Sequence, residues 1–212
     1  MAKIDSLEKL MVEELRELLD AEKEVMQSLP NMAKAAGAEE LQMAFREHQQ
    51  QTTAQLDRLR QVFEAIGGPA RGKKCKGMQA LIEEGQEMMA QVEAGPARDA
   101  VLIASAQKVE HYEMAAYGTL RTWASLLGYE EAAELLDETL NQEKETDARL
   151  TTIAEAIANP EAAGEVEVEE DEEERPRATR GRKQPSRSAS SGRGSRAASR
   201  GGRKTAGGAR KK

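Results

Sequence analysis

The chain has 212 residues, of which 33% are charged and only 3% are aromatic. This length suits one domain plus a tail, and the composition favours long helices over a β-sandwich or barrel. A single cysteine, Cys75, excludes an intramolecular disulfide and suits a reducing cytosol. The sequence contains neither an apolar run long enough to span a membrane nor an N-terminal signal-peptide core, so we expect a cytoplasmic protein.

The net charge of -7 conceals two regions of opposite sign. Residues 175–212 contain fourteen Lys and Arg and no acidic residue, whereas residues 165–174 contain eight acidic residues and no basic one. Of the chain's 31 basic and 38 acidic residues, 17 and 30 therefore remain in residues 1–164, a net charge of -13. The sequence thus indicates an acidic domain that carries a basic tail.

Four long stretches place apolar residues three and four positions apart, which is the spacing of helices packed against other helices. The first should begin at Asp5, which forms a capping box with Glu8, and should end at Gly37. Pro30 should kink or interrupt it near its end. The second is predicted over residues 39–66.

A shorter helix over residues 78–92 is predicted next, after a basic loop. Two more long helices should cover residues 99–127 and 130–158, the last ending at Asn159-Pro160. Two helical hairpins joined by a long crossover are typical of ferritin-like bundles. We therefore predict an all-α fold, a ferritin-like four-helix bundle with a short crossover helix in residues 1–158.

Each predicted bundle helix carries acidic or imidazole groups near the middle of its apolar face. A bare carboxylate is costly to bury unless a positive group pairs with it. In this architecture, carboxylates and imidazoles from four helices hold di-iron or di-manganese centres, so metal ions would supply the missing charge. The candidate metal ligands are Glu22, His48, Glu110, Glu113, Glu143 and Asp147, with Glu14 and Glu17 as alternatives to Glu22.

A simpler interpretation competes with a metal site. Because the chain has 38 acidic residues, some fall at inward positions by chance. His48 fits a core histidine bonded to a neighbour equally well. His111 lies one step off the apolar face, so we expect it to be exposed or at an interface.

Three segments closely resemble the YciF/YciE family of bacterial stress proteins. They read A-Q-K-V-E-H-Y-E-M-A-A-Y-G-T-L (106–120), G-K-K-C-K-G-M-Q-A-L-I-E-E-G (72–85) and E-T-L-N-Q-E-K-E-T-D (138–147). The resemblance covers about residues 5–158. It implies a ferritin-like fold related to rubrerythrin and a di-iron-type site, with Glu110, Glu113 and Glu143 matching ligand glutamates.

Two helices depart from the pattern that this resemblance implies. The second helix should contain Glu-x-x-His but offers only His48 beside the neutral amides of Gln50 and Gln51. The last helix has Thr146 where a histidine is expected, with Asp147 as a substitute. A weakened, mononuclear or absent site are the alternatives, and we expect fewer than two iron ions per chain.

Residues 159–212 contain few large apolar groups, which predicts a disordered segment. We divide it into an acidic linker, 159–174, and a basic tail, 175–212. The tail should bind duplex DNA through phosphate contacts, unless it only solubilises the chain or folds back on the acidic bundle. The candidate DNA-binding residues are Arg180, Arg182 and Lys183, in a motif like the Arg-Gly-Arg core that enters A·T-rich minor grooves, and Arg203 and Lys204.

Two functions fit these features. The first is a metal-binding stress protein that oxidises Fe(II) or consumes peroxide and is tethered to DNA in the nucleoid. The second is a non-catalytic structural or interaction protein that binds no metal. We expect a homodimer in both cases, because closed two-fold pairs are the commonest assembly.

Overall fold

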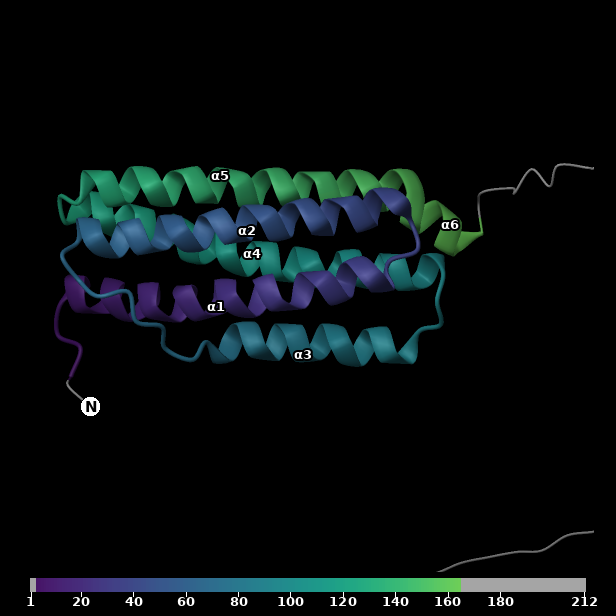
Figure 1. The fold of residues 1–212 in the computed structure, drawn as a ribbon, viewed down its shortest axis with the longest axis horizontal. Helices are drawn as coiled ribbons and strands as arrows, with labels where there is room; N and C mark the ends of the chain where they lie inside the picture. Colours follow the sequence, from purple (N-terminus) through teal and green to yellow (C-terminus); the bar gives the residue numbers. More distant parts are fainter. Residues whose placement is uncertain (1–2, 165–212) are drawn as a thin grey trace, which may run out of the picture. The chain divides into compact units, whose positions relative to one another are not determined.

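The computed structural model describes residues 3–164, which are almost entirely helical and contain no strand (Figure 1). The helices are α1 (Leu7–Ala35), α2 (Glu39–Ala65), α3 (Lys76–Gln91), α4 (Pro96–Leu126), α5 (Glu130–Ile153), a π-helical segment η1 (Ala154–Ala158) and α6 (Asn159–Ala163). The predicted ferritin-like bundle with a crossover helix is confirmed. The predicted basic tail and most of the acidic linker lie outside the described residues.

Two antiparallel hairpins, α1–α2 and α4–α5, lie side by side along their length and form the four-helix bundle (Figure 1). The crossover helix α3 lies outside the bundle and packs on α1 and α4. Only one of its side chains, Met78, is fully buried. None of the described helices is long and apolar enough to cross a membrane.

The core follows the apolar faces that the spacing predicts. On α4 the buried residues include Ile103, Ala106, Tyr117, Leu120 and Ala124. Burying a large apolar side chain stabilises a fold by about 1.5–3 kcal/mol, so a seam of this length holds two long helices together. The polar residues Glu110 and Glu113 lie on the same buried face.

The start of α1 differs from the prediction. Ser6, not Asp5, caps the helix, because its backbone is extended and its Oγ accepts a hydrogen bond from the Lys9 amide at 3.2 Å. The Asp5 carboxylate instead binds the Lys9 ammonium group at 2.6 Å. Glu8 accepts a hydrogen bond from the Tyr129 hydroxyl at 2.7 Å. The predicted capping box is therefore wrong.

Two prolines lie within helical chain without ending it. Helix α1 continues past Pro30 to Ala35. The predicted end at Asn159-Pro160 is wrong, because the helix continues to Ala163. Proline cannot donate to the carbonyl four residues earlier, and its ring crowds that carbonyl. The wider π-helical turn Ala154–Ala158 immediately precedes α6, and Pro160 occupies the first turn of that helix, where a proline is tolerated.

The turn between α1 and α2 is fixed by a residue far along the chain. Asp99, in the first turn of α4, accepts hydrogen bonds from the Gly37 amide at 2.7 Å and the Ala38 amide at 2.8 Å. Its side chain is buried. This carboxylate joins the two hairpins at one end of the bundle.

We predict that Asp99→Ala lowers the free energy of unfolding by roughly 1–3 kcal/mol, because two backbone donors lose a charged acceptor. Urea unfolding of the full chain, followed by circular dichroism, measures the change. Asp57→Ala is the matched control, since Asp57 is exposed and pairs only with nearby Arg60. It should cost less than about 0.5 kcal/mol. Equal losses in the two variants would contradict the role of Asp99.

Candidate metal centre

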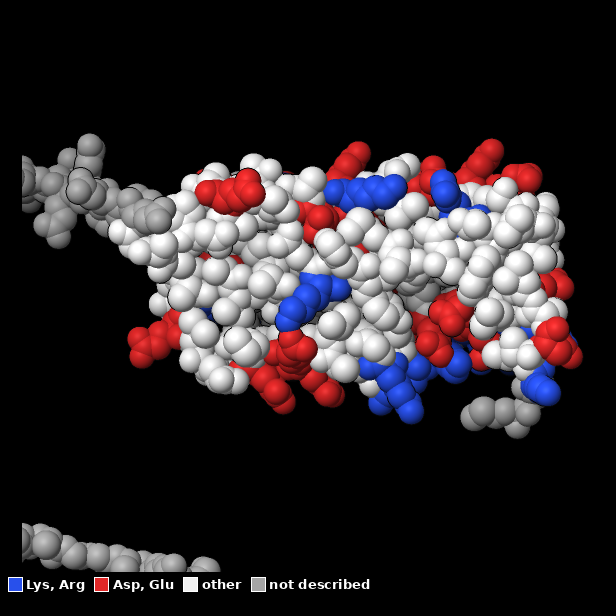
Figure 2. All heavy atoms as spheres, turned by 180° about the vertical axis from the view of Figure 1, so that it is seen from behind, with Lys and Arg blue, Asp and Glu red and all other residues white. Residues whose placement is uncertain are grey.

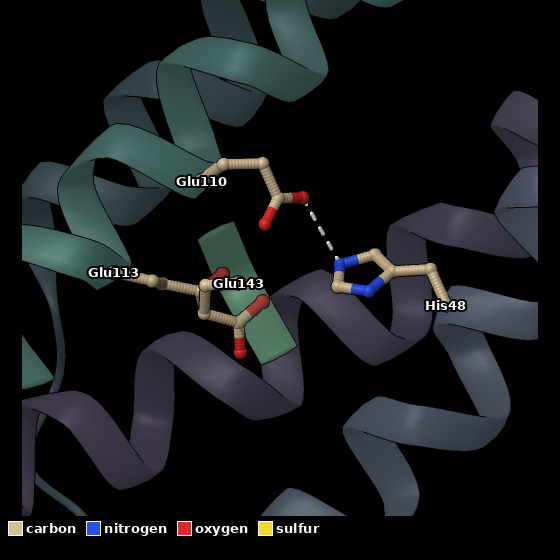
Figure 3. Close-up of side chains that lie close together, drawn as sticks. All are labelled: His48, Glu110, Glu113 and Glu143. Carbon is tan, nitrogen blue, oxygen red and sulfur yellow. Dashed lines mark ion pairs between the residues drawn. The ribbon is translucent and has the colours of Figure 1, made fainter. Parts of the chain in front are cut away.

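Four buried side chains from three helices converge inside the bundle (Figure 3). His48 comes from α2, Glu110 and Glu113 from α4, and Glu143 from α5. Each offers one ligand atom, and these atoms lie within 4.8 Å of one another. All four residues are at most 4% exposed, so water does not solvate their side chains as it would at the surface. We call these four residues the inner cluster.

Helical geometry explains how the acidic groups meet. Glu110 and Glu113 are three residues apart, so they point to the same face of α4. Because α4 and α5 form an antiparallel hairpin, Glu143 on α5 lies beside that face. His48 approaches from the facing α2, with its Nε2 atom 3.2 Å from the Glu110 Oε1 atom. The cluster therefore contains a single ion-pair contact, drawn as the dashed line in Figure 3.

Most polar atoms of the inner cluster lack a hydrogen-bond partner. Among the described residues, the buried side-chain atoms without one are Gln55 Oε1 and six cluster atoms, namely His48 Nδ1 and Nε2, Glu110 Oε2, Glu113 Oε1, and Glu143 Oε1 and Oε2. The His48–Glu110 contact is close enough for an ion pair but is not aligned as a hydrogen bond. Buried polar groups in native proteins are nearly always satisfied, so this concentration requires an explanation.

Burial and mutual repulsion favour the protonated carboxylic acids. Burial raises the pKa of Glu113 well above its ordinary value, and the charges of Glu22, Glu143 and Glu110 raise it further. The pKa of Glu143 is raised well above its ordinary value by burial and by Glu22 and Glu110, although Arg58 opposes the shift. Without another cation, protons would neutralise these acids.

The imidazole of His48 is affected in the opposite sense. Burial lowers its pKa, but the charge and contact of Glu110, together with Glu22, outweigh burial, so the pKa is raised overall. His48 is thus favoured in its charged form when the carboxylates are ionised. A metal ion would displace this proton, since a histidine ligand must be neutral.

Glu22 lies next to the inner cluster but is not one of its four members. It is 1% exposed and accepts a short hydrogen bond from the hydroxyl of Tyr117 on α4. Burial raises its pKa to about 7, against the lowering effects of Tyr117, His48 and Arg58. The sequence predicts Glu22 as a metal ligand; the structure places it beside the four residues, with its carboxylate bonded to the Tyr117 hydroxyl.

The structure places the other candidate ligands elsewhere. Asp147 accepts a hydrogen bond from Gln107 at 3.1 Å and lies 3.4 Å from His111, which is exposed as predicted. Glu14 is exposed. Glu17 binds the Lys73 ammonium group at 2.6 Å. Of the three candidate acids on α1, only Glu22 is buried.

Two contributing groups are missing from the sequence-based set. Tyr117 is an apolar-face residue by its spacing, and nothing in that spacing indicates that its hydroxyl reaches Glu22. Arg58 lies one step off the α2 face, yet its side chain is only 12% exposed. It donates to Thr139 at 2.9 Å and Gln142 at 3.1 Å, which holds a guanidinium near Glu22 and Glu143. The role of Arg58 is recognised by its proximity to Glu22 and Glu143, and that proximity is visible only once the fold is known.

The donor set fits a divalent transition metal. Three carboxylates and one imidazole supply oxygen and nitrogen ligands, which suit iron, manganese or zinc better than a soft metal. Each of these residues has at least one buried polar atom without a hydrogen-bond partner, and each offers one atom within reach of a common ion. The arrangement is therefore chemically suited to a metal, and its buried position would keep the ion away from bulk water.

Comparison with known proteins places the chain in a family. The chain matches the family described as "Domain of unknown function (DUF892)" over residues 6–163. It is 44% identical over 150 residues to Protein YciF of Escherichia coli strain K12, a match that covers 70% of this chain and 90% of that protein.

Solved structures agree with this assignment. The crystal structure of the E. coli stress protein YciF superposes with a TM-score of 0.69 at 43% identity, covering 71% of this chain and 96% of that one. The structure of YcfI from Rhodopseudomonas palustris gives a TM-score of 0.70 at 36% identity, covering 72% and 97%. The resemblance found in the sequence is confirmed: the chain belongs to the DUF892 family and is a relative of the stress protein YciF.

Proposed function

We propose that this protein binds a divalent transition metal, iron or manganese, through His48, Glu110, Glu113 and Glu143. One observation carries the proposal: the atoms of these buried side chains converge, and six of them have no hydrogen-bond partner among the described residues. Coordination by a metal ion would satisfy one nitrogen of His48 and carboxylate oxygens of the three glutamates together. It would also supply the positive charge that three neighbouring carboxylates need.

Protons compete with the metal for the same site. In the metal-free protein, the raised pKa values of Glu113 and Glu143 favour their protonated forms, and His48 and Arg58 provide positive charge nearby. This arrangement suits a protein that holds no metal at all, which is the alternative structural function. In a protein without metal, the neutral acids would leave buried oxygens without hydrogen-bond partners, which native proteins rarely tolerate. In a protein with metal, the ion would coordinate these oxygens.

The number of ions is limited by the neutral residues beside the cluster. Gln51 stands where members of the resembling family often have an acid, and Thr146 stands where the ferritin-like pattern expects a histidine; neither side chain carries charge. Thr146 also donates its hydroxyl to the Gln142 carbonyl at 3.1 Å. We therefore propose a site that holds fewer than two ions per chain.

Bound iron would supply the one-electron chemistry that amino-acid side chains lack. The residues of this chain would bind the ion, exclude bulk water and keep Glu22 in place through Tyr117. Fe(II) oxidation or peroxide consumption is the activity that this combination suits, and YciF of E. coli is described as a stress protein. We extend that role to this chain as part of the proposal.

Metal titration of the full-length, chelator-treated protein tests the site. Wild type should bind Fe(II) under anaerobic conditions, and Glu113→Gln should bind it at least about tenfold more weakly because one ligand is lost. Glu87→Gln, an exposed residue on α3, is the control and should match wild type. Circular dichroism checks that each variant is helical.

Indistinguishable affinities of the Glu113→Gln and Glu87→Gln variants would remove the inner cluster from metal binding. Absence of binding by the wild type would favour the structural alternative. Two tightly bound ions per chain would show that the neutral Gln51 and Thr146 do not limit the site.

We predict a distinctive pH dependence for the metal-free protein. The pKa of Glu22 is about 7 when folded against 4.5 ordinarily, so between these values the folded protein holds a proton that the unfolded chain has released. Stability conferred by this group is therefore complete below about pH 4.5 and is lost as the pH rises to about 7. The slope should not exceed about 1.4 kcal/mol per pH unit for one group.

Urea unfolding at a series of pH values, with chelator present, measures this slope. Glu22→Gln removes the titrating group, and the free energy of unfolding of this variant should depend less on pH. Excess metal should reverse the trend in wild type, since the metal binds deprotonated ligands. Parallel curves for wild type and variant would contradict the effect of Glu22.

We propose in addition that residues 175–212 tether the protein to duplex DNA. Their fourteen positive charges form a segment that would release condensed cations from DNA phosphates. The bundle itself should repel DNA, because residues 1–164 carry a net charge of -13. Figure 2 shows acidic side chains along both long edges of the face that it presents.

Deleting residues 175–212 should abolish the gel shift of duplex DNA and leave the thermal transition of the bundle nearly unchanged. Binding should weaken steeply with salt, because each phosphate contact releases cations. Substituting alanine for Arg180, Arg182 and Lys183 should reduce affinity for A·T-rich duplexes more than the same change at Arg203, Lys204 and Arg210, a control with equal charge. A shift by the truncated bundle, or no binding by the full chain in low salt, would contradict this proposal.

A further inference from the structure

A cleft of about 160 Å³ opens between α2 and α5 and reaches the inner cluster. Its inner end is formed by His48 and Glu110, which are 4% and 1% exposed. Half-buried Gln51 and Thr146 form part of its walls. Glu145 and Arg149, both exposed on α5, lie at its outer end. The cleft therefore joins the surface to two of the four cluster residues.

The outer end of the cleft is charged. Arg149 forms an ion pair with Glu47 that links α5 to α2, and the side chains of this pair are 44% and 55% exposed. Glu145 and Arg149 line the outer end, and Glu47 lies beside it as the partner of Arg149, so two carboxylates accompany one guanidinium there. Their net negative charge favours the approach of a cation, and charged clefts raise the association rate of ions of opposite sign.

The volume of the cleft selects among possible ligands. About 10–15 Å³ of space for the centre of a water molecule is enough to hold one water, so the cleft has room for a divalent ion with several waters. Organic ligands occupy pockets of roughly 300–1,000 Å³. The cleft therefore admits a hydrated ion or a molecule as small as peroxide, and its volume lies below the range usual for organic ligands.

We infer that this cleft is the route by which a hydrated divalent cation reaches the buried cluster, an inference that rests on the proposed metal binding. His48 and Glu110 line the cleft, so they would be the cluster residues that an entering ion meets first. Glu113 and Glu143 do not line it and would hold the ion from the buried side. Gln51 and Thr146, on the walls, would offer oxygen atoms to the ion on its way.

Another described hollow, between α1, α3 and α4, does not serve this purpose. It measures about 50 Å³ and is lined largely by apolar side chains such as Met32, Ile82 and Met89. None of the inner cluster residues lines it. An apolar wall gives no ligand to a cation that is losing water.

Blocking the cleft tests the route. Glu145→Cys places a reactive thiol at its outer end, while native Cys75 is fully buried and should not react. The full-length variant is labelled with pyrenylmaleimide, and Co(II) binding is followed by stopped-flow absorption before and after labelling. Asn141→Cys, exposed one turn earlier on α5, is the matched control.

Labelling at position 145 should slow cobalt binding at least about tenfold, because the ion then needs an opening motion to enter. The amount bound at equilibrium and the dissociation constant should stay unchanged, because the block slows entry and exit equally. Labelling at position 141 should change the rate less than about twofold. Unchanged rates after labelling at position 145, with cobalt bound, would overturn the route alone. No cobalt binding by the unlabelled protein would overturn the route and the metal site together.

Discussion

The burial of acidic groups inside the bundle is the constraint on which the rest of the structure depends. The inner cluster contains Glu110, Glu113 and Glu143, and Glu22 lies beside it. Each would cost several kcal/mol to bury as an isolated ion. The surrounding residues reduce that cost in different ways: His48 contacts Glu110, Tyr117 donates to Glu22, and Arg58 provides a nearby guanidinium. What these groups leave uncompensated is available to protons or to a metal ion.

The fold was predictable because its determinants are repeated along the chain. The spacing of apolar residues identified five helices, and glycine and proline marked most of their ends. The predictions were wrong at helix ends, where a single local contact decides which residue begins or ends the helix. Ser6 and Asp5 are adjacent residues that could each cap the helix. The residue that does so is the one whose side chain accepts a hydrogen bond from the Lys9 amide, which is Ser6. The helix continues past Pro160 after a π-helical turn, and no pattern of residues in the sequence predicts that turn.

The candidate site was predictable only in part. Glu110, Glu113, Glu143 and His48 lie on apolar faces, where a charged residue is conspicuous in the sequence. The spacing of residues along one helix does not give the distances between helices. It therefore could not show whether Asp147 and Glu22 are better or worse candidate ligands than the other four residues. The Asp147 carboxylate contacts Gln107 and His111 instead of the inner cluster. Arg58 was missed because its long side chain reaches inward from an off-face position, a behaviour that residue spacing does not describe.

The π-helical turn at Ala154–Ala158 also bears on how the chain tolerates changes in length. In a regular helix, one inserted or deleted residue rotates every later side chain by about 100° and would turn a buried face toward solvent. A π-helical turn contains one residue more than an α-helical turn requires, and it follows the last residue of the inner cluster by about three turns. Insertions and deletions of one residue can therefore occur at this end without altering the alignment of Glu143 with α4, whereas the same change earlier in α5 would dismantle the cluster.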